Sequence, residues 1–231
     1  MAGGSSLFVA EVFRIGPLVV TNTVVVTWAI MLGLWGLCRW GTRRLDITPS
    51  RLQVLLEGAV SAMDDAVRLV LPEQSATVLP FIATLWIFIV VSNLASLIPG
   101  VRSPTGDLST TVALAILVFL AAHWYGIRAH GLRAYLRHYL LPNPILLPFH
   151  VISEISRTIA LAMRLFGNIF SLQMAALLVL LVAGFLVPVP VLMLHIVEAL
   201  VQAYIFGMLA LIYVAGAMQS HQIKQSMEKE Q

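Results

Sequence analysis

The sequence predicts an all-α polytopic membrane protein with about five transmembrane helices and one amphipathic interfacial helix. Only 11% of its 231 residues are charged and 59% are hydrophobic, whereas soluble domains carry about 25% charged residues. Long charge-free windows alternate with short segments that hold the basic residues. The charges are too few to cover a soluble surface, so residues 1–231 are expected to form a single membrane domain.

Five apolar windows mark the expected spans, at about residues 15–38, 78–98, 108–126, 152–186 and 191–217. Each is long enough to cross a bilayer as a helix. The last two are the longest, and about 30 residues at 1.5 Å per residue extend for roughly 45 Å. Because the hydrocarbon layer is only about 30 Å thick, we expect these two helices to be strongly tilted or to project from the membrane.

Two connecting segments have distinct patterns. The segment from Ser50 to Arg68 has the polar and apolar faces of an amphipathic helix, and Ser50 is a candidate N-cap. Between the third and fourth spans, Pro142, Pro144 and Pro148 oppose a regular helix.

Basic residues predict the orientation of the chain. They gather after the first, third and fifth spans, and only Arg14 and Arg102 lie on the opposite side. The positive-inside rule therefore places the N-terminus outside and the C-terminus in the cytoplasm. The residues on the cytoplasmic side are Arg39, Arg43, Arg44, Arg51, Arg68, Arg128, Arg133, Arg137, Lys224 and Lys229.

Arg164 is the only charge between Arg157 and Glu198. A cation near the centre of a membrane helix costs roughly 3 kcal/mol on translocon scales, and arginine cannot lose its proton to avoid that cost. Such a residue is expected to serve an anionic partner or a moving ion. The alternative is an arginine that snorkels to the membrane interface.

Helical spacing sorts the other polar residues of the fourth span into faces. Asn168 and Ser171 follow Arg164 by four and seven residues, so they share its face, as does Arg157. Gln173 follows Arg164 by nine residues, about 180° around the helix, and should face a different neighbour. The amides have a simpler alternative role, which is to hydrogen-bond helices together.

The fifth span carries His195, Glu198 and Gln202 on one face. A histidine and a buried carboxyl one turn apart are a candidate proton relay. The alternatives are a static buried pair and a metal site, but no third ligand is evident. The single cysteine, Cys38, excludes a multi-cysteine metal site, and no phosphate-binding loop or nucleophile motif is present.

Several motifs closely resemble subunit a of F-type ATP synthases, and the likeness runs through most of the chain. The most specific is Arg164-Leu165-Phe166-Gly167-Asn168, followed by His195 and by Gln202-Ala203-Tyr204-Ile205-Phe206. Further matching segments are Thr21-Asn22-Thr23, Pro80-Phe81-Ile82-Ala83-Thr84-Leu85, Ser92-Asn93-Leu94, Ile98-Pro99-Gly100, Asp107-Leu108-Ser109 and Ile152-Ser153-Glu154-Ile155-Ser156-Arg157.

The resemblance implies a stator that lies beside a rotating ring of c subunits. Arg164 is similar to the essential arginine that faces the ring carboxylate, Asn168 and Gln202 match polar positions of the ion path, and His195 matches a position in the outer half-channel. Many relatives carry Glu or His where this chain has Gln173, so Glu198 is the candidate for the missing carboxyl. Glu154 and His150 are candidates for the cytoplasmic half-channel, with Glu154 alternatively paired to Arg157.

The resemblance also implies that the chain is a non-catalytic subunit of a bacterial inner-membrane complex. Its partners would be the c-ring, the b subunits of the peripheral stalk, the rest of the F1Fo complex and the lipid bilayer. No nucleic acid, metal or other cofactor is expected. The transported ion, proton or sodium, stays open. The alternative is a stand-alone secondary ion transporter or channel, which would predict an internal repeat and interrupted helices.

Overall fold

The computed structural model describes residues 11–15, 18–41, 51–98, 103–133, 147–183 and 188–219. Within these ranges, five helices are long and apolar enough to cross a membrane. A sixth long helix is amphipathic. The predicted all-α membrane fold is confirmed, with one short β-hairpin added at its start.

The hairpin consists of β1 (Glu11–Ile15) and β2 (Leu18–Thr21), which pair antiparallel. The first predicted span included β2, but helix α1 (Asn22–Gly41) begins only after it. The segment that became β2 is Leu-Val-Val-Thr. Branching at Cβ restricts the side-chain rotamers of Val and Thr in helices and favours extended backbone. A hydropathy profile does not include this conformational preference, so the predicted start of the first span was too early.

Helix α2 (Arg51–Val70) is the predicted amphipathic helix. Arg68 and Asp64 form an ion pair of 2.7 Å on its polar side, while Val67 and the following Leu71 are buried in the core. Helix α2 packs against α3 (Ser75–Leu94). The proposed N-cap, Ser50, lies outside the described residues.

A short segment of tight turns connects the second and third spans. Helix α3 continues into a 3-10 turn, η1 (Ala95–Leu97), and a second one, η2 (Pro104–Gly106), precedes α4 (Leu108–His130). The Asp107 carboxylate accepts a hydrogen bond of 3.0 Å from the Ser109 amide, which caps α4 at the predicted start. Turn η2 contacts α3, α4 and α6, so it lies within the helix group.

The two longest helices are α6 (Leu147–Ala183) and α7 (Pro188–Gln219), with 37 and 32 residues. The predicted fourth span began at 152, and the expectation that Pro148 opposes a helix was wrong. Pro148 is the second residue of α6, and proline fits the first turn because the amide hydrogen it lacks has no acceptor there. Helix α7 likewise begins at a proline, Pro188.

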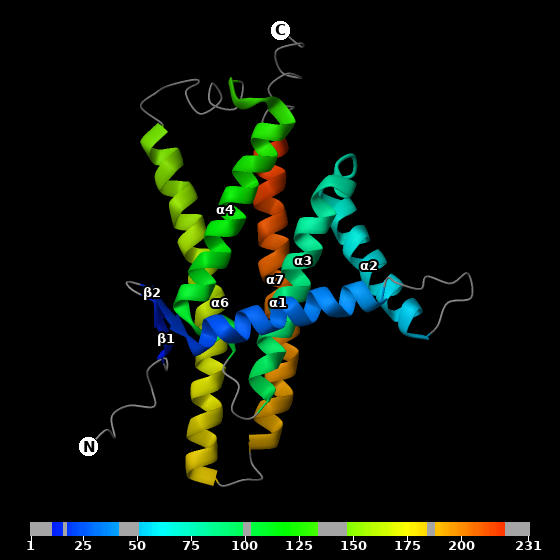
Figure 1. The fold of residues 1–231 in the computed structure, drawn as a ribbon. Coiled ribbons are helices and arrows are strands. Elements are labelled where there is room, and N and C mark those ends of the chain that lie inside the picture. The colour runs from blue at the N-terminus through cyan, green and yellow to red at the C-terminus, as the bar shows by residue number, and fades with distance from the viewer. Residues whose placement is uncertain are drawn as a thin grey trace.

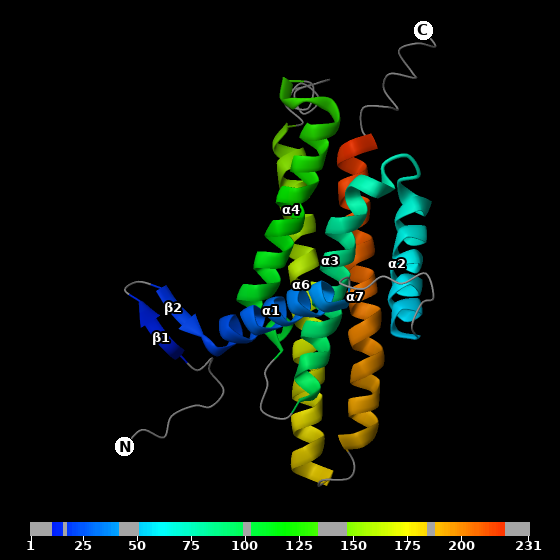
Figure 2. The same ribbon diagram turned by 45° about the vertical axis from the view of Figure 1, so that its right-hand side comes forward.

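Helices α3, α4, α6 and α7 run alongside one another, whereas α1 lies crosswise to them in both views (Figures 1 and 2). These helices therefore cannot all follow the bilayer normal. Helix α1 has 20 residues, or about 30 Å, which matches the hydrocarbon layer. Helix α6 extends for about 55 Å. The expectation that the two long helices are strongly tilted or project from the membrane stays a prediction.

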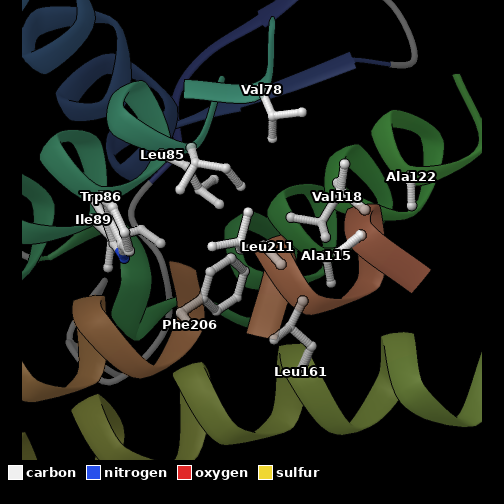
Figure 3. Close-up of a cluster of buried hydrophobic side chains, with 14 of the residues drawn as sticks. Val78, Leu85, Trp86, Ile89, Ala115, Val118, Ala122, Leu161, Phe206 and Leu211 are labelled. Carbon is white, nitrogen blue, oxygen red and sulfur yellow. The ribbon is translucent and has the colours of Figure 1, made fainter. Parts of the chain in front are cut away.

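The core lies where α3, α4, α6 and α7 meet (Figure 3). Leu161 of α6 and Phe206 of α7 are buried there with Ala115 and Val118 of α4. The small alanine lets the helices approach closely, which is how membrane helices gain packing contacts.

Gly207 leaves room for the Trp86 indole where α3 packs against α7. A Cβ at this position would lie 1.8 Å from Nε1 of Trp86. The Trp86 indole stacks on Tyr204, with ring centroids 6.1 Å apart, and its N–H donates to the Tyr204 carbonyl at 3.3 Å. No other residue type fits at position 207 without moving the indole.

Candidate functional site

Arg164 lies at the middle of α6, 17 residues after Leu147 and 19 before Ala183. Its side chain is exposed on the isolated chain. It forms no ion pair or hydrogen bond with any residue that the structure describes. Each end of the helix is about 25 Å or more away along the axis.

One face of α6 is directed away from the other helices. Arg157, Arg164 and Ser171 are exposed on this face, and we call it the Arg164 face. The opposite face is packed in the protein and consists of Leu161, Leu165, Ile169 and Leu172. The predicted stripe therefore faces outward.

Asn168 lies at the edge of the Arg164 face, where α6 meets α7. Its Nδ2 donates a hydrogen bond of 2.6 Å to Oε1 of Gln202. Gln202 is 1% exposed, and its Nε2 has no partner among the described residues. The amide pair thus joins the two long helices one turn from Arg164, and it leaves one buried donor unsatisfied.

Gln173 faces a different neighbour, as the helical spacing predicts. Its side chain is half-buried against η2, where a Cβ on Gly106 would lie 2.9 Å from its Oε1. Glycine at 106 gives this amide room beside the turn. Gln173 therefore belongs to the interior between α6 and η2.

His195 is buried in α7, with 5% of its surface exposed. Its Nε2 lies 2.6 Å from Oγ of Ser96 in η1, so its partner is a serine and not Glu198. Glu198 is half-buried and has no hydrogen bond or ion pair to the described residues. A static His–Glu pair is absent from this part of the chain.

A second polar group surrounds Asn93 of α3. Asn93 donates to the Ala199 carbonyl of α7 at 3.2 Å and accepts a hydrogen bond of 2.5 Å from Thr105 of η2. Ser103 bonds the Ser92 carbonyl at 2.7 Å. Helical spacing within single spans did not predict this network. Its signal was a cluster of polar residues at 92, 93 and 96 in an otherwise apolar window.

The two candidates for the cytoplasmic half-channel lie one turn apart near the start of α6. His150 is exposed and Glu154 is half-buried. The expected alternative pairing of Glu154 with Arg157 is absent from the described ranges. Ten residues, or about 15 Å, separate Glu154 from Arg164 along the helix.

The described residues contain no cluster of three or more His, Cys, Asp or Glu side chains that could hold a metal ion. The arrangement instead combines one exposed cation, a buried histidine, a half-buried carboxyl and a set of paired amides and hydroxyls. Such groups hold and pass charge inside a membrane.

Comparison with known proteins gives a consistent result over most of the chain. The family model "ATP synthase A chain" matches residues 23–215. The chain is 61% identical to ATP synthase subunit a 2 of Pelobacter propionicus, over 95% of this chain and 96% of that protein. It is 58% identical to ATP synthase subunit a of Legionella pneumophila, over 94% of each chain. The chain belongs to the ATP synthase A chain family.

Proposed function

We propose that this protein is the ion-translocating stator subunit of the Fo sector of an F-type ATP synthase. Its partners are then the c-ring, the b subunits and the rest of the F1Fo complex. The observation that carries the proposal is Arg164, an exposed cation at the centre of a 37-residue membrane helix with no described partner. A charge in that position needs an anionic partner supplied by another chain.

In this proposal the Arg164 face lies against the c-ring. Arg164 keeps each passing ring carboxylate ionised until it reaches the second half-channel. The guanidinium stays charged at every accessible pH, so its fixed charge also opposes a direct leak of cations between the half-channels. Each elementary charge that crosses 100 mV supplies about 2.3 kcal/mol, so several ions must pass for each ATP.

We assign the outer half-channel to the groups on α7 and their neighbours. His195 is the buried titratable group, and Glu198 is a half-buried carboxyl without a described partner. Gln173 cannot titrate, so we assign it to the wall of this half-channel as a hydrogen-bonding group. Asn168 and Gln202 lie between this region and Arg164. The ion is a proton or a sodium ion, since the ring site that selects it belongs to another chain.

We assign Glu154 and His150 to the cytoplasmic half-channel. The basic residues after spans one, three and five support a cytoplasmic start for α6. The N-terminus is then outside a bacterial inner membrane and the C-terminus inside. Glu154 is half-buried on α6, so its carboxyl can lie along the path that leads from Arg164 to the cytoplasm.

Cysteine cross-linking tests the proposed contact. With Cys38 replaced, a cysteine at Ser171 should cross-link to c subunits near their carboxylate, because Ser171 is exposed on the Arg164 face. A cysteine at Gln173 is the matched control and should cross-link poorly, because that side chain lies against η2. Equal yields at both positions would contradict the assignment. Purification without a ring of small hairpin subunits would favour a stand-alone transporter.

A further inference from the structure

The contact between His195 and Ser96 indicates which atoms of these two side chains carry the hydrogens. Nε2 of His195 lies 2.6 Å from Oγ of Ser96, and that same Oγ lies 2.6 Å from the main-chain carbonyl oxygen of Asn93. Both distances are those of hydrogen bonds. A serine hydroxyl has one hydrogen to donate, so it can donate to only one of these two neighbours.

The carbonyl oxygen decides the direction of both bonds. A carbonyl can only accept, and two oxygens about 2.6 Å apart repel each other unless a hydrogen lies between them. The Ser96 hydroxyl therefore donates to Asn93, and its oxygen accepts from His195. The reverse arrangement, with Ser96 donating to His195, would leave the oxygen–oxygen contact without a hydrogen.

The neutral ring of His195 then carries its hydrogen on Nε2, because a neutral imidazole has one N–H. Nδ1 bears the lone pair and has no hydrogen-bond partner among the described residues. The Nε2–H bond to Ser96 survives when Nδ1 gains a proton. The ring is thus held in one orientation in both charge states.

The rest of the network fixes Ser96 itself. Asn93 is tied to α7 by its bond to the Ala199 carbonyl, one turn after His195, and to η2 by its bond from Thr105. Asn93 and Thr105 are both fully buried. Two further buried hydrogen bonds therefore anchor the side chain of Asn93, the residue whose main-chain carbonyl accepts from Ser96.

We propose that Ser96 is a positioning residue that holds His195 in the Nε2–H tautomer, so that Nδ1 is the nitrogen that accepts and releases protons. In that exchange one N–H bond forms and breaks at Nδ1, and the Nε2–H bond stays intact. The inference rests on the proposed function for the meaning of the proton exchange, but the tautomer itself is a property of this chain alone.

The test is solid-state NMR of the intact, reconstituted ATP synthase complex labelled with 13C and 15N histidine. The spectrum is recorded at a pH of about 8.5, above the ordinary histidine pKa of about 6.5. The His195→Gln complex identifies the signal by difference. We expect a protonated Nε2 and a bare Nδ1. A neutral ring that carries its hydrogen on Nδ1 would overturn the proposal.

Two variants separate positioning from packing. Ser96→Ala removes the acceptor and should give mixed tautomers, with ATP-driven proton uptake about fivefold slower, the effect of losing one neutral hydrogen bond. Ser96→Thr keeps the hydroxyl and should keep both the tautomer and the uptake. An unchanged tautomer in Ser96→Ala would contradict the assignment. Arg164→Ala tests the proposed function separately. Normal ATP-driven pumping in this variant would refute the proposed function, but it would not change the His195 tautomer that NMR measures.

Discussion

The arginine of α6 and two polar residues of α7 are placed in opposite ways. About half of the most apolar window of α7 is buried inside the protein, against 22% for α6. His195 and Gln202 of α7 point inward and have partners on η1 and α6, whereas Arg164 of α6 points outward and has none among the described residues. Polar groups that a chain satisfies internally contribute to its own packing, and one that it leaves exposed in a membrane serves another molecule.

The strongest test of this contrast is the removal of the exposed cation. Arg164→Ala should abolish ATP-driven ion transport and leave assembly of the complex intact, because the side chain has no described partner in this chain. Arg164→Lys should be severely impaired, since an ammonium group cannot reproduce the planar, permanently charged guanidinium. ATP-driven uptake into reconstituted vesicles measures both variants. Normal uptake with alanine would refute the central role of Arg164.

Glu198 should have the next largest effect. Glu198→Gln keeps the shape of the side chain and removes its titratable proton, so we expect transport to fall about tenfold or more. The matched control is Glu73→Gln, at an exposed glutamate outside the spans. Adding Gln173→Glu should recover part of the rate if both positions line one aqueous path. Unchanged transport in Glu198→Gln would make this carboxyl a structural group.

A substitution at Gly207 tests the packing of α7 against α3. Gly207→Ala places a methyl group 1.8 Å from Nε1 of Trp86, and overpacking of this kind costs about 1–3 kcal/mol. The thermal stability of the purified complex should fall. Gly216→Ala is the control because a methyl group at that position would have no atom within 4 Å. Equal stability of both variants would show that α3 and α7 can separate without cost.

The Asn168–Gln202 bond should have a smaller effect. A double-mutant cycle with Asn168→Leu and Gln202→Leu should give a coupling energy of about 0.6 kcal/mol, the average for polar contacts between membrane helices. Thermal unfolding of the complex measures it. A coupling near zero would mean that this bond does not stabilise the joint between α6 and α7.

The smallest effect is expected at the surface of α2. The hydrogen bond from Arg68 to Asp64, followed by their charge attraction, raises the pKa of the Arg68 guanidinium above its ordinary value. Since the pair is exposed on one helix, solvent screens it. Asp64→Asn should leave both thermal stability and transport unchanged. A clear loss would identify the polar side of α2 as a binding surface.

Composition and charge spacing were sufficient to predict the membrane fold, the five spans and the amphipathic helix. These features depend on transfer from water to lipid, which each segment experiences largely by itself. The helix boundaries were less predictable. The strand at Leu18–Thr21 depends on pairing with β1, and hydropathy contains no information about such pairing.

Which residues share a helical face also followed from the order of residues alone, because 3.6 residues per turn fixes that relation within each helix. This spacing correctly separated Gln173 from Arg164. Which face is covered, and which partner each polar group meets, depended on how the helices pack together. Ser96 and His195 are 99 residues apart in the chain, and a contact of that kind depends on how α3 and α7 pack, which no local pattern of residues specifies.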